Sequence, residues 1–364
     1  MGRDVSMMPM HQDWDIFCRV IDNYGDIGVC WRLARQLVRE HGKTVRLWVD
    51  DLPSLSAICP EARPDVSSQQ VAGVRICHWR PDFVTDSTAS VVIEAFACEL
   101  PPDYIAAMAQ RPQRPCWINL EYLTAEAWAD GCHGMASPHP ELSLVKHFFF
   151  PGFTRLTGGL LRESHIPGAQ LCAASEPLTI SLFCYETAPV DALLSALAAM
   201  PIPVRCLVTP GKPLAAVRRI LGGDGPWQSG LARIEAVPFR PMDDYDDLLR
   251  SCDLNFVRGE DSFVRGQLAG KPMVWHIYPQ DEDAHLLKLD AFLERYCSDL
   301  PGAESSAIRM IFHAWNHAAP FAPAWNALIQ EMPAIRKHAV NWQNSLKNQP
   351  DLAGSLVKFC ADKV

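Results

Sequence analysis

The sequence predicts an α/β protein with two facing, doubly wound Rossmann-like domains and a cleft between them. Along most of the 364 residues, apolar runs of strand length alternate with helical patterns, which indicates parallel β-α-β units. The alternation stops once, in a polar, proline-containing stretch at 165–179, and then restarts. With 48% apolar residues the chain can fill two cores. We expect an N-terminal domain at 1–170, joined by a C-terminal helix at 341–364, and a C-terminal domain at 178–340.

The first domain begins with a strand at 14–21 and a helix at 26–42, which closes on Gly42, a favourable C-cap residue. Proline at the start of 101–111 favours a helix there, because the first helical turn tolerates proline. The other elements expected in this domain are strands at 43–51, 73–79, 90–98 and 114–123 and a helix at 52–59.

The second domain repeats the same alternation. Its expected strands are 178–186, 203–211, 232–239, 252–259 and 272–279, and its expected helices are 188–200, 212–223, 242–252 and 261–271. Two further helical patterns follow at 337–348 and 351–363. Because ligands of open α/β sheets bind beyond the carboxyl ends of the strands, the functional residues should lie in strand-to-helix turns.

The composition indicates a cytoplasmic protein without nucleic-acid or membrane partners. A net charge of −9 argues against a nucleic-acid binder, which usually carries a basic face. No apolar run approaches the roughly 20 residues of a membrane span, and residues 1–14 lack the apolar core of a secretory signal. The 13 cysteines include no Cys-x-x-Cys pair, which is typical of reduced intracellular thiols.

The turn after the first strand, "IDNYGDIG" at 21–28, carries two carboxylates and two glycines. Gly25 and Gly28 allow positive φ and close approach of the backbone to a ligand. Asp26 stands at the start of the helix, where it is either a functional carboxylate or only an N-cap. Asp22 is open to the same question, because an aspartate can merely brace a loop. The turn lacks the glycine fingerprint of dinucleotide binding.

A second polar turn, 258–262, follows the fourth strand of the second domain. A helix N-terminus with exposed N–H groups beside an arginine makes a diphosphate site without a metal. Asp261 or Ser262 can cap this helix. The alternative is a plain glycine turn in which Arg258 pairs with Glu260 or Asp261.

No metal site is expected. His313 and His317 lie four residues apart but lack the glutamate of a zinc-binding His-Glu-x-x-His helix. The acidic run Asp243–Asp247 is interpreted as a solvated helix face with a cap.

Long and unusual motifs recur along nearly the whole chain: "IFCRVIDNYGDIGVCWRLARQL", "VVIEAFAC", "INLEYL", "FVRGEDSFVRGQLAGKP" and "WHIYPQDEDAHLLKL". Together they resemble the protein-arginine rhamnosyltransferases of translation elongation factor P, the EarP family. The resemblance implies a GT-B fold, with the donor held mainly by the C-terminal domain, and inversion of the anomeric centre. It also implies dTDP-β-L-rhamnose as the donor, an arginine of elongation factor P as the acceptor, and no metal or other cofactor.

The resemblance also implies roles for residues of both turns. The family's proposed catalytic aspartate falls on Asp26, the first aspartate of the same motif on Asp22, and the essential glutamate on Glu260. The implied donor-binding residues are Asn23, Tyr24, Gly25, Phe183, Tyr185, Phe239, Met242, Tyr245, Arg258, Gly259, Asp261 and Ser262. Some relatives carry Gln where this chain has Met242, so the hydrogen bond to the thymine base should be lost or replaced by backbone contacts.

A guanidinium acceptor stays protonated in water and becomes a good nucleophile only when it loses a proton. Asp26 is the candidate base, and Asp22 is expected to orient the guanidinium beside it. Glu260 serves either the sugar hydroxyls or the reacting centre; the sequence leaves both roles open. Arg258 and the N–H groups of the next helix should stabilise the leaving dTDP.

Other functions remain as alternatives. One is a nucleotide-sugar-dependent GT-B transferase with a lipid or small-molecule acceptor. Another is a non-enzymatic two-domain protein that closes on a ligand. A nucleotide-sugar epimerase would need a nicotinamide fingerprint and a Tyr-x-x-x-Lys pair, and neither is evident.

Overall fold

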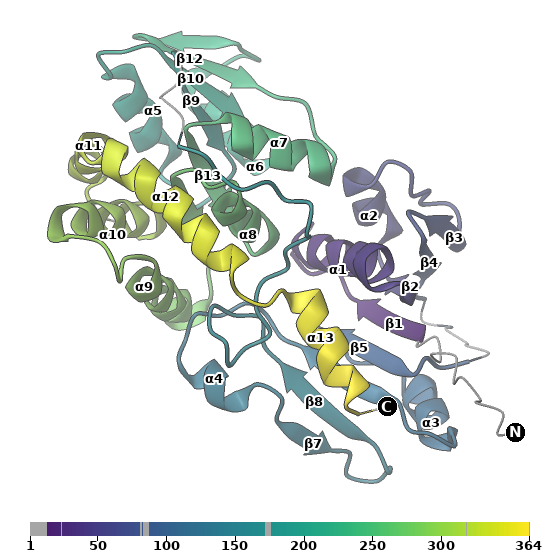
Figure 1. Ribbon diagram of the computed structural model, residues 1–364. Coiled ribbons are helices and arrows are strands. Elements are labelled where there is room, and N and C mark those ends of the chain that lie inside the picture. Colours follow the sequence, from purple (N-terminus) through teal and green to yellow (C-terminus); the bar gives the residue numbers. More distant parts are fainter. Residues whose placement is uncertain are drawn as a thin grey trace, which may run out of the picture. The chain divides into compact units, whose positions relative to one another are not determined.

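The computed structural model describes residues 13–22, 24–80, 82, 87–171, 176–317 and 319–363. The chain forms two compact α/β units, whose elements are labelled in Figure 1. Of the described residues, 13–123, 129–164 and 350–363 make up the N-terminal unit, and 124–128 and 165–349 make up the C-terminal unit. Within this part of the chain, no helix is long and apolar enough to cross a membrane.

The N-terminal unit contains an eight-stranded sheet, counted over its described residues, in the order β3-β4-β2-β1-β5-β6-β8-β7. The central strands are parallel, and the edge strands β3 and β7 pair antiparallel with their neighbours. The strands are β1 (Asp13–Cys18), β2 (Thr44–Val49), β3 (Ser68–Val71), β4 (Val74–His78), β5 (Val91–Ala95), β6 (Cys116–Leu120), β7 (Ala136–Pro138) and β8 (Val145–Phe149). Because β1 lies between β2 and β5, the strand order reverses at β1, and ligands of such sheets bind at this reversal.

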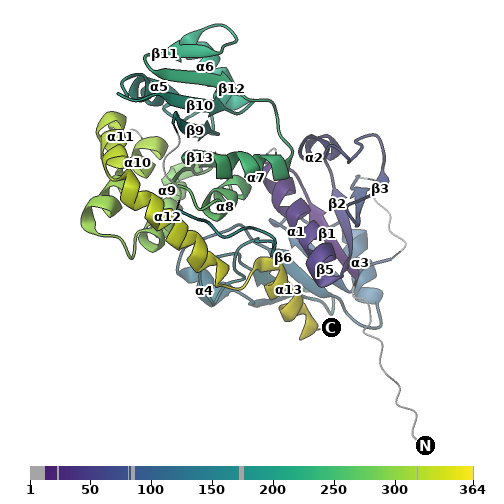
Figure 2. The ribbon, with the colours of Figure 1, turned by 45° about the horizontal axis from the view of Figure 1, so that its top comes forward.

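The helices of the N-terminal unit are α1 (Gly25–His41), α2 (Leu52–Ile58), α3 (Pro102–Gln110), α4 (Trp128–Cys132) and α13 (Leu352–Ala361). Helix α13 packs beside α1 (Figures 1 and 2). The Gln36 side chain of α1 donates to the Asp351 carboxylate at 3.1 Å and to the backbone carbonyl of Arg162 at 2.9 Å. Asp351 also caps α13 by accepting the N–H of Gly354. The end of the described chain is therefore part of the unit that contains its beginning.

The C-terminal unit contains a sheet in the order β11-β12-β10-β9-β13-β14. Its strands are β9 (Leu178–Leu182), β10 (Val204–Val208), β11 (Trp227–Ser229), β12 (Ala232–Ala236), β13 (Leu254–Arg258) and β14 (Met273–His276). All neighbours are parallel except β11, which pairs antiparallel with β12. Here the order reverses between β9 and β13, so the turns after these two strands are the expected place for a ligand.

The helices of the C-terminal unit are α5 (Val190–Ala198), α6 (Lys212–Leu221), α7 (Met242–Ser251), α8 (Asp261–Leu268), the 3₁₀ turn η1 (Asp281–Asp283), α9 (Ala284–Tyr296), α10 (Gly302–Asn316), α11 (Phe321–Gln330) and α12 (Met332–Lys347). Helix α12 braces α8, because Gln343 donates to the Leu268 carbonyl at 2.7 Å and Trp342 donates to Gln267 at 2.8 Å. The chain returns to the N-terminal unit only at Pro350, later than the boundary at 341 that the sequence indicated.

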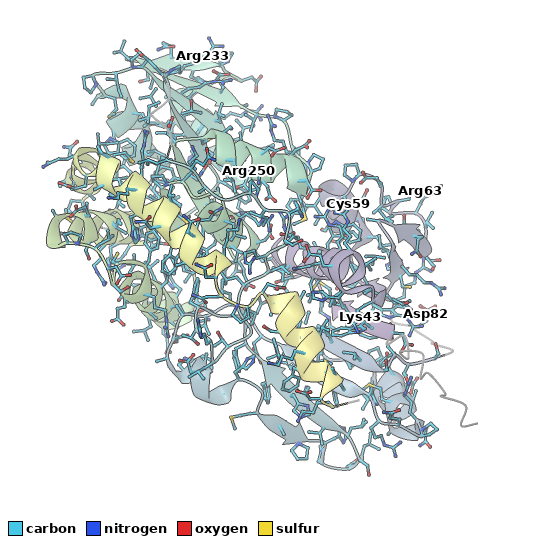
Figure 3. All side chains as sticks on the ribbon, viewed as in Figure 1. Lys43, Cys59, Arg63, Asp82, Arg233 and Arg250 are labelled. Atoms are coloured by element: carbon cyan, nitrogen blue, oxygen red, sulfur yellow. The ribbon has the colours of Figure 1, made fainter. Side chains whose placement is uncertain are left out.

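The acidic run at the start of α7 is not the fully solvated face that the sequence indicated. Asp246 is buried and pairs with the buried Arg265 of α8 at 2.6 Å. Asp247 does face solvent and pairs with Arg250, which Figure 3 labels on α7. One residue of the run therefore ties two helices together, and its neighbour forms an ordinary surface pair.

Candidate active site

The first polar turn joins the end of β1 to the start of α1. The Gly25 N–H donates to the Asp22 carbonyl at 2.7 Å, which closes the turn. Tyr24 is the N-cap residue and provides no side-chain capping bond among the described residues. Asp26 is the second residue of α1, so the interpretation of this carboxylate as an N-cap is wrong. Asn23 lies outside the described residues.

The Asp26 carboxylate binds back to the loop that precedes it. Its Oδ2 accepts the N–H groups of Ile21 at 2.8 Å and Asp22 at 2.9 Å, and its Oδ1 accepts the Tyr122 hydroxyl at 3.2 Å. The residue is only 2% exposed. Burial raises the pKa of Asp26, while the two N–H groups and the Tyr122 hydroxyl oppose that rise. A buried carboxylate with a raised pKa is suited to accept a proton near neutral pH.

The glycines of this turn do not have the positive φ that the sequence indicated. Gly25 and Gly28 both lie in α1, and neither is among the described residues with positive φ. A Cβ added at Gly25 would lie 3.1 Å from Oδ2 of Asp22. Gly25 therefore provides space for the Asp22 side chain rather than an unusual backbone conformation.

Tyr122, which the sequence analysis did not single out, is part of this cluster. Its ring stacks on Phe96 with centroids 4.3 Å apart and an interplanar angle of 15°. Phe96 and Ala97 follow β5 with positive φ values of 56° and 52°, a conformation that costs energy for residues other than glycine. Both aromatic residues lie within the quoted motifs "VVIEAFAC" and "INLEYL", but only the fold brings them next to Asp26.

The second polar turn joins β13 to α8 in the C-terminal unit. Gly259 has a positive φ of 60°, as a sharp turn requires. The Ser262 hydroxyl accepts the Arg258 N–H at 3.0 Å and donates to the Arg258 carbonyl, so it closes the turn. Glu260, not Asp261 or Ser262, is the N-cap residue, and it makes no side-chain capping bond among the described residues. The side chain of the N-cap residue thus does not cap the first N–H groups of α8 within the described chain.

Arg258 points its guanidinium over two aromatic rings. The guanidinium carbon lies 4.4 Å from the ring centre of Phe183 and 4.5 Å from that of Tyr185. Its Nη1 is buried and has no hydrogen-bond partner among the described residues. A buried, unsatisfied cationic donor beside an uncapped helix N-terminus is a site for an anionic group.

His276, at the end of β14, supports Tyr185. Its Nδ1 accepts the Tyr185 N–H at 3.2 Å, so the ring proton lies on Nε2, which faces the Thr187 hydroxyl at 3.3 Å. Burial and the charge of Arg258 lower the pKa of His276 to about 4. The neutral His276 imidazole therefore holds the backbone N–H of Tyr185, whose ring packs against the Arg258 guanidinium.

The remaining predicted donor-binding residues surround the same strand ends. Tyr245 on α7 contacts Phe183 edge to face, with centroids 5.8 Å apart. Phe239 precedes α7 and is 44% exposed. Met242 is the first residue of α7 and is buried. Phe239 therefore offers an exposed ring for stacking, whereas Met242 contributes to packing.

The predicted site residues thus fall into two clusters. The carboxylate cluster, Asp22 and Asp26 with Tyr122, belongs to the N-terminal unit. The anion-binding cluster, Arg258 with the start of α8 and the rings of Phe183 and Tyr185, belongs to the C-terminal unit.

The comparisons with known proteins agree over the length of the chain. Residues 14–361 match the family model described as elongation-factor P (EF-P) rhamnosyltransferase EarP. A protein-arginine rhamnosyltransferase of Pseudomonas putida is 47% identical over 96% of this chain and 99% of its own, and one of Pseudomonas aeruginosa is 45% identical over the same shares.

Among solved structures, one that concerns EarP-mediated arginine glycosylation of EF-P is 34% identical, with a TM-score of 0.65, and covers 97% of this chain and 100% of its own. The MurG of Acinetobacter baumannii, at 13% identity, has a TM-score of 0.53 over 97% of this chain and 99% of its own, a likeness of fold alone. The two α/β units have the predicted GT-B fold, and the predicted glycosyltransferase class is confirmed. The chain belongs to the EarP family of EF-P rhamnosyltransferases.

Proposed function

We propose that this protein transfers L-rhamnose from dTDP-β-L-rhamnose to an arginine side chain of elongation factor P, with inversion at the anomeric carbon. The observation that carries the proposal is the match to protein-arginine rhamnosyltransferases over nearly the whole chain. The solved relative at 34% identity concerns arginine glycosylation of EF-P, which supports EF-P as the acceptor. Because this acceptor is a translation factor, the reaction would take place in the cytoplasm.

The carboxylate cluster fits the acceptor. A guanidinium has a pKa above about 12 and must lose a proton to present a nitrogen lone pair. Asp26 is buried, and its raised pKa makes it a better proton acceptor than an ordinary carboxylate. In the proposed reaction Asp26 accepts that proton as the new C–N bond forms. Asp22, on the same turn, holds the planar guanidinium.

The anion-binding cluster fits the donor. As the C–O bond to the sugar breaks, negative charge gathers on the leaving dTDP. The buried Nη1 of Arg258 and the first N–H groups of α8 can donate hydrogen bonds to the diphosphate. Phe183, Tyr185 and the exposed Phe239 supply rings for the base and sugar. Glu260, the residue before α8, is assigned to the sugar or the reacting centre.

The proposed reaction proceeds without a bound metal ion. Arg258 and the start of α8 supply the positive charge that a metal supplies in other nucleotide-sugar enzymes. Treatment with a chelator should therefore leave the initial rate unchanged. A rate that falls on chelation and returns with Mg²⁺ would contradict this part of the proposal.

The test is to incubate the purified protein with dTDP-β-L-rhamnose and elongation factor P from the same organism, and to follow the acceptor by intact mass spectrometry. We expect the gain of one deoxyhexose on one arginine, and no gain when that arginine is replaced by lysine. The binding of dTDP without modification of EF-P would instead support a transferase with another acceptor. The non-enzymatic alternative does not fit the enzyme class of the family.

A further inference from the structure

Among the described residues, three donors reach the Asp26 carboxylate, which leaves one hydrogen-bonding position for an incoming group. A carboxylate offers about four lone-pair positions, two on each oxygen. Oδ2 accepts the N–H groups of Ile21 and Asp22, and Oδ1 accepts the Tyr122 hydroxyl. The second lone pair of Oδ1 is therefore the position from which Asp26 can receive a proton.

The placement of that lone pair depends on Tyr122. The two N–H bonds to Oδ2 come from adjacent residues of one loop, so they restrain the rotation of the carboxylate plane only from one side. The bond at 3.2 Å from Tyr122, which follows β6, restrains the other oxygen. The Tyr122 ring is itself held by its stack on Phe96, in the left-handed turn after β5.

We propose that Tyr122 is the positioning residue of Asp26, and that its hydroxyl orients the carboxylate so that Oδ1 receives the proton of the acceptor guanidinium. This inference deepens the proposed function and rests on it for the identity of the acceptor. Tyr122 acts through Asp26: it neither gives up nor keeps a proton in the reaction. Phe96 acts one step further away, as the platform for the Tyr122 ring.

The titratable groups around Asp26 come from several elements. Asp22 on the same turn raises the pKa of Asp26, and the Tyr122 hydroxyl after β6 lowers it. Cys18, at the end of β1, stays a neutral thiol, because its hydrogen bond with the Cys30 thiol and its burial raise its pKa. The negative charges of Asp26 and Asp50 raise the pKa of Cys18 as well. Among the described residues named in this paragraph, only Tyr122 donates a side-chain hydrogen bond to Asp26.

The test is Tyr122→Phe, which removes the hydroxyl and keeps the ring stacked on Phe96. The pKa of Asp26 should rise further, since a donor to its charged form is lost. We expect kcat at neutral pH to fall about tenfold, the loss typical of one hydrogen bond to a charged group. The acid limb of the pH–rate profile should move to higher pH, with the donor KM unchanged. The control is Tyr296→Phe, which removes a tyrosine hydroxyl from the core of the C-terminal unit.

An unchanged pH–rate profile in Tyr122→Phe would overturn the proposal, even if kcat fell, because a merely structural role moves kcat alone. Phe96→Leu keeps the Tyr122 hydroxyl but removes the ring on which Tyr122 stacks. It should move the acid limb of the pH–rate profile to higher pH by less than Tyr122→Phe does. This variant tests the proposal if Tyr122→Phe does not fold. A carbon-13 NMR titration of the Asp26 carboxyl without substrates gives a second readout. If the wild-type protein transfers no rhamnose, the proposed function fails, but this titration still tests whether Tyr122 controls Asp26.

Discussion

The two strand-to-helix turns share an architecture but have opposite chemistry. Each follows a strand at which the sheet order reverses, and each opens a helix whose N-cap residue, Tyr24 or Glu260, gives no side-chain cap within the described chain. In the first turn a buried carboxylate accepts hydrogen bonds from its own loop. In the second, a guanidinium lies over two rings and keeps a buried nitrogen without a partner among the described residues.

The difference shows how one architecture can carry either a hydrogen-bonded carboxylate or a cationic donor. The Asp26 carboxylate is already largely satisfied, so it is held in place and has room for one further donor. Nη1 of the Arg258 guanidinium has no partner among the residues that the structure describes, so an anion can gain a strong hydrogen bond there. The first turn is suited to take up a proton, and the second is suited to hold a leaving group.

Asp26→Asn should have the largest effect. Asparagine keeps an acceptor for the Ile21 and Asp22 N–H groups but cannot take a proton, so kcat should fall by about 10²- to 10⁴-fold. The free energy of unfolding should change little, because asparagine keeps the size of the side chain and an acceptor for both N–H groups. Initial rates from intact mass spectrometry and the thermal midpoint measure the two quantities. A folded variant with nearly full activity would remove Asp26 from catalysis and break the contrast.

Arg258→Lys should chiefly weaken donor binding. Lysine keeps the charge but loses the planar group that lies over Phe183 and Tyr185 and the donor at Nη1. We expect the Kd for dTDP to rise by about 30-fold or more, as for a broken buried charge pair worth about 2 kcal/mol. Calorimetric titration measures it. The matched control is Arg250→Lys at the surface pair with Asp247, where binding should be unchanged.

Asp26 in the first turn and His276, which supports Tyr185, should change the stability with pH in opposite directions. The pKa of His276 is lowered from 6.5 to about 4 in the folded protein, so the folded state binds this proton less tightly than the unfolded chain. The resulting contribution to the free energy of unfolding is complete above pH 6.5 and is lost as the pH falls to about 4. In total it amounts to roughly 3 kcal/mol. The raised pKa of Asp26 works the other way: its folded form binds the proton more tightly, so stability falls as the pH rises above 3.8.

Urea unfolding between pH 7 and pH 4.5, compared between the wild-type protein and His276→Gln, measures the first contribution. Other buried histidines contribute to the total slope, so the difference between the two proteins is the quantity of interest. Equal slopes for both proteins would contradict the assignment of a neutral His276.

Gly259→Ala and Gly25→Ala should separate the two glycine roles with the smallest effects. Alanine at Gly259 must adopt a φ of 60°, which costs about 1 to 2 kcal/mol of unfolding free energy. Alanine at Gly25 keeps a helical conformation, but its Cβ displaces the Asp22 carboxylate. We therefore expect stability loss from the first variant, and lower kcat with little stability loss from the second. Thermal unfolding and initial rates distinguish them, and equal stability losses would remove the distinction.

The alternation of strands and helices was visible in the sequence because parallel strands are buried on both faces and form apolar runs. β1, β5 and β13 were predicted on that basis. The short edge strands β3, β7 and β11 were not, because an edge strand buries less and carries a mixed pattern, as in Ser68–Val71. The helices between 284 and 330 were also missed.

At the sites, the sequence identified the turns but not their partners. Asp26 and Arg258 stood out because they end strands and begin helices. Tyr122 and His276 did not, because their roles arise from contacts across 96 and 91 residues of sequence. A hydroxyl that orients a distant carboxylate leaves no local pattern, and neither does an imidazole that supports a distant backbone N–H.

The packing of α13 beside α1 has a consequence for synthesis on the ribosome. The N-terminal unit ends its second segment at residue 164 and is completed only by residues from Pro350 onward. At about 5–20 residues per second, roughly 10 to 40 s pass between these two points. During that time Gln36 lacks its Asp351 partner and the surface of α1 under α13 is uncovered. The N-terminal unit, which contains Asp26, therefore cannot complete its folding until residues 165–349 of the C-terminal unit have been translated.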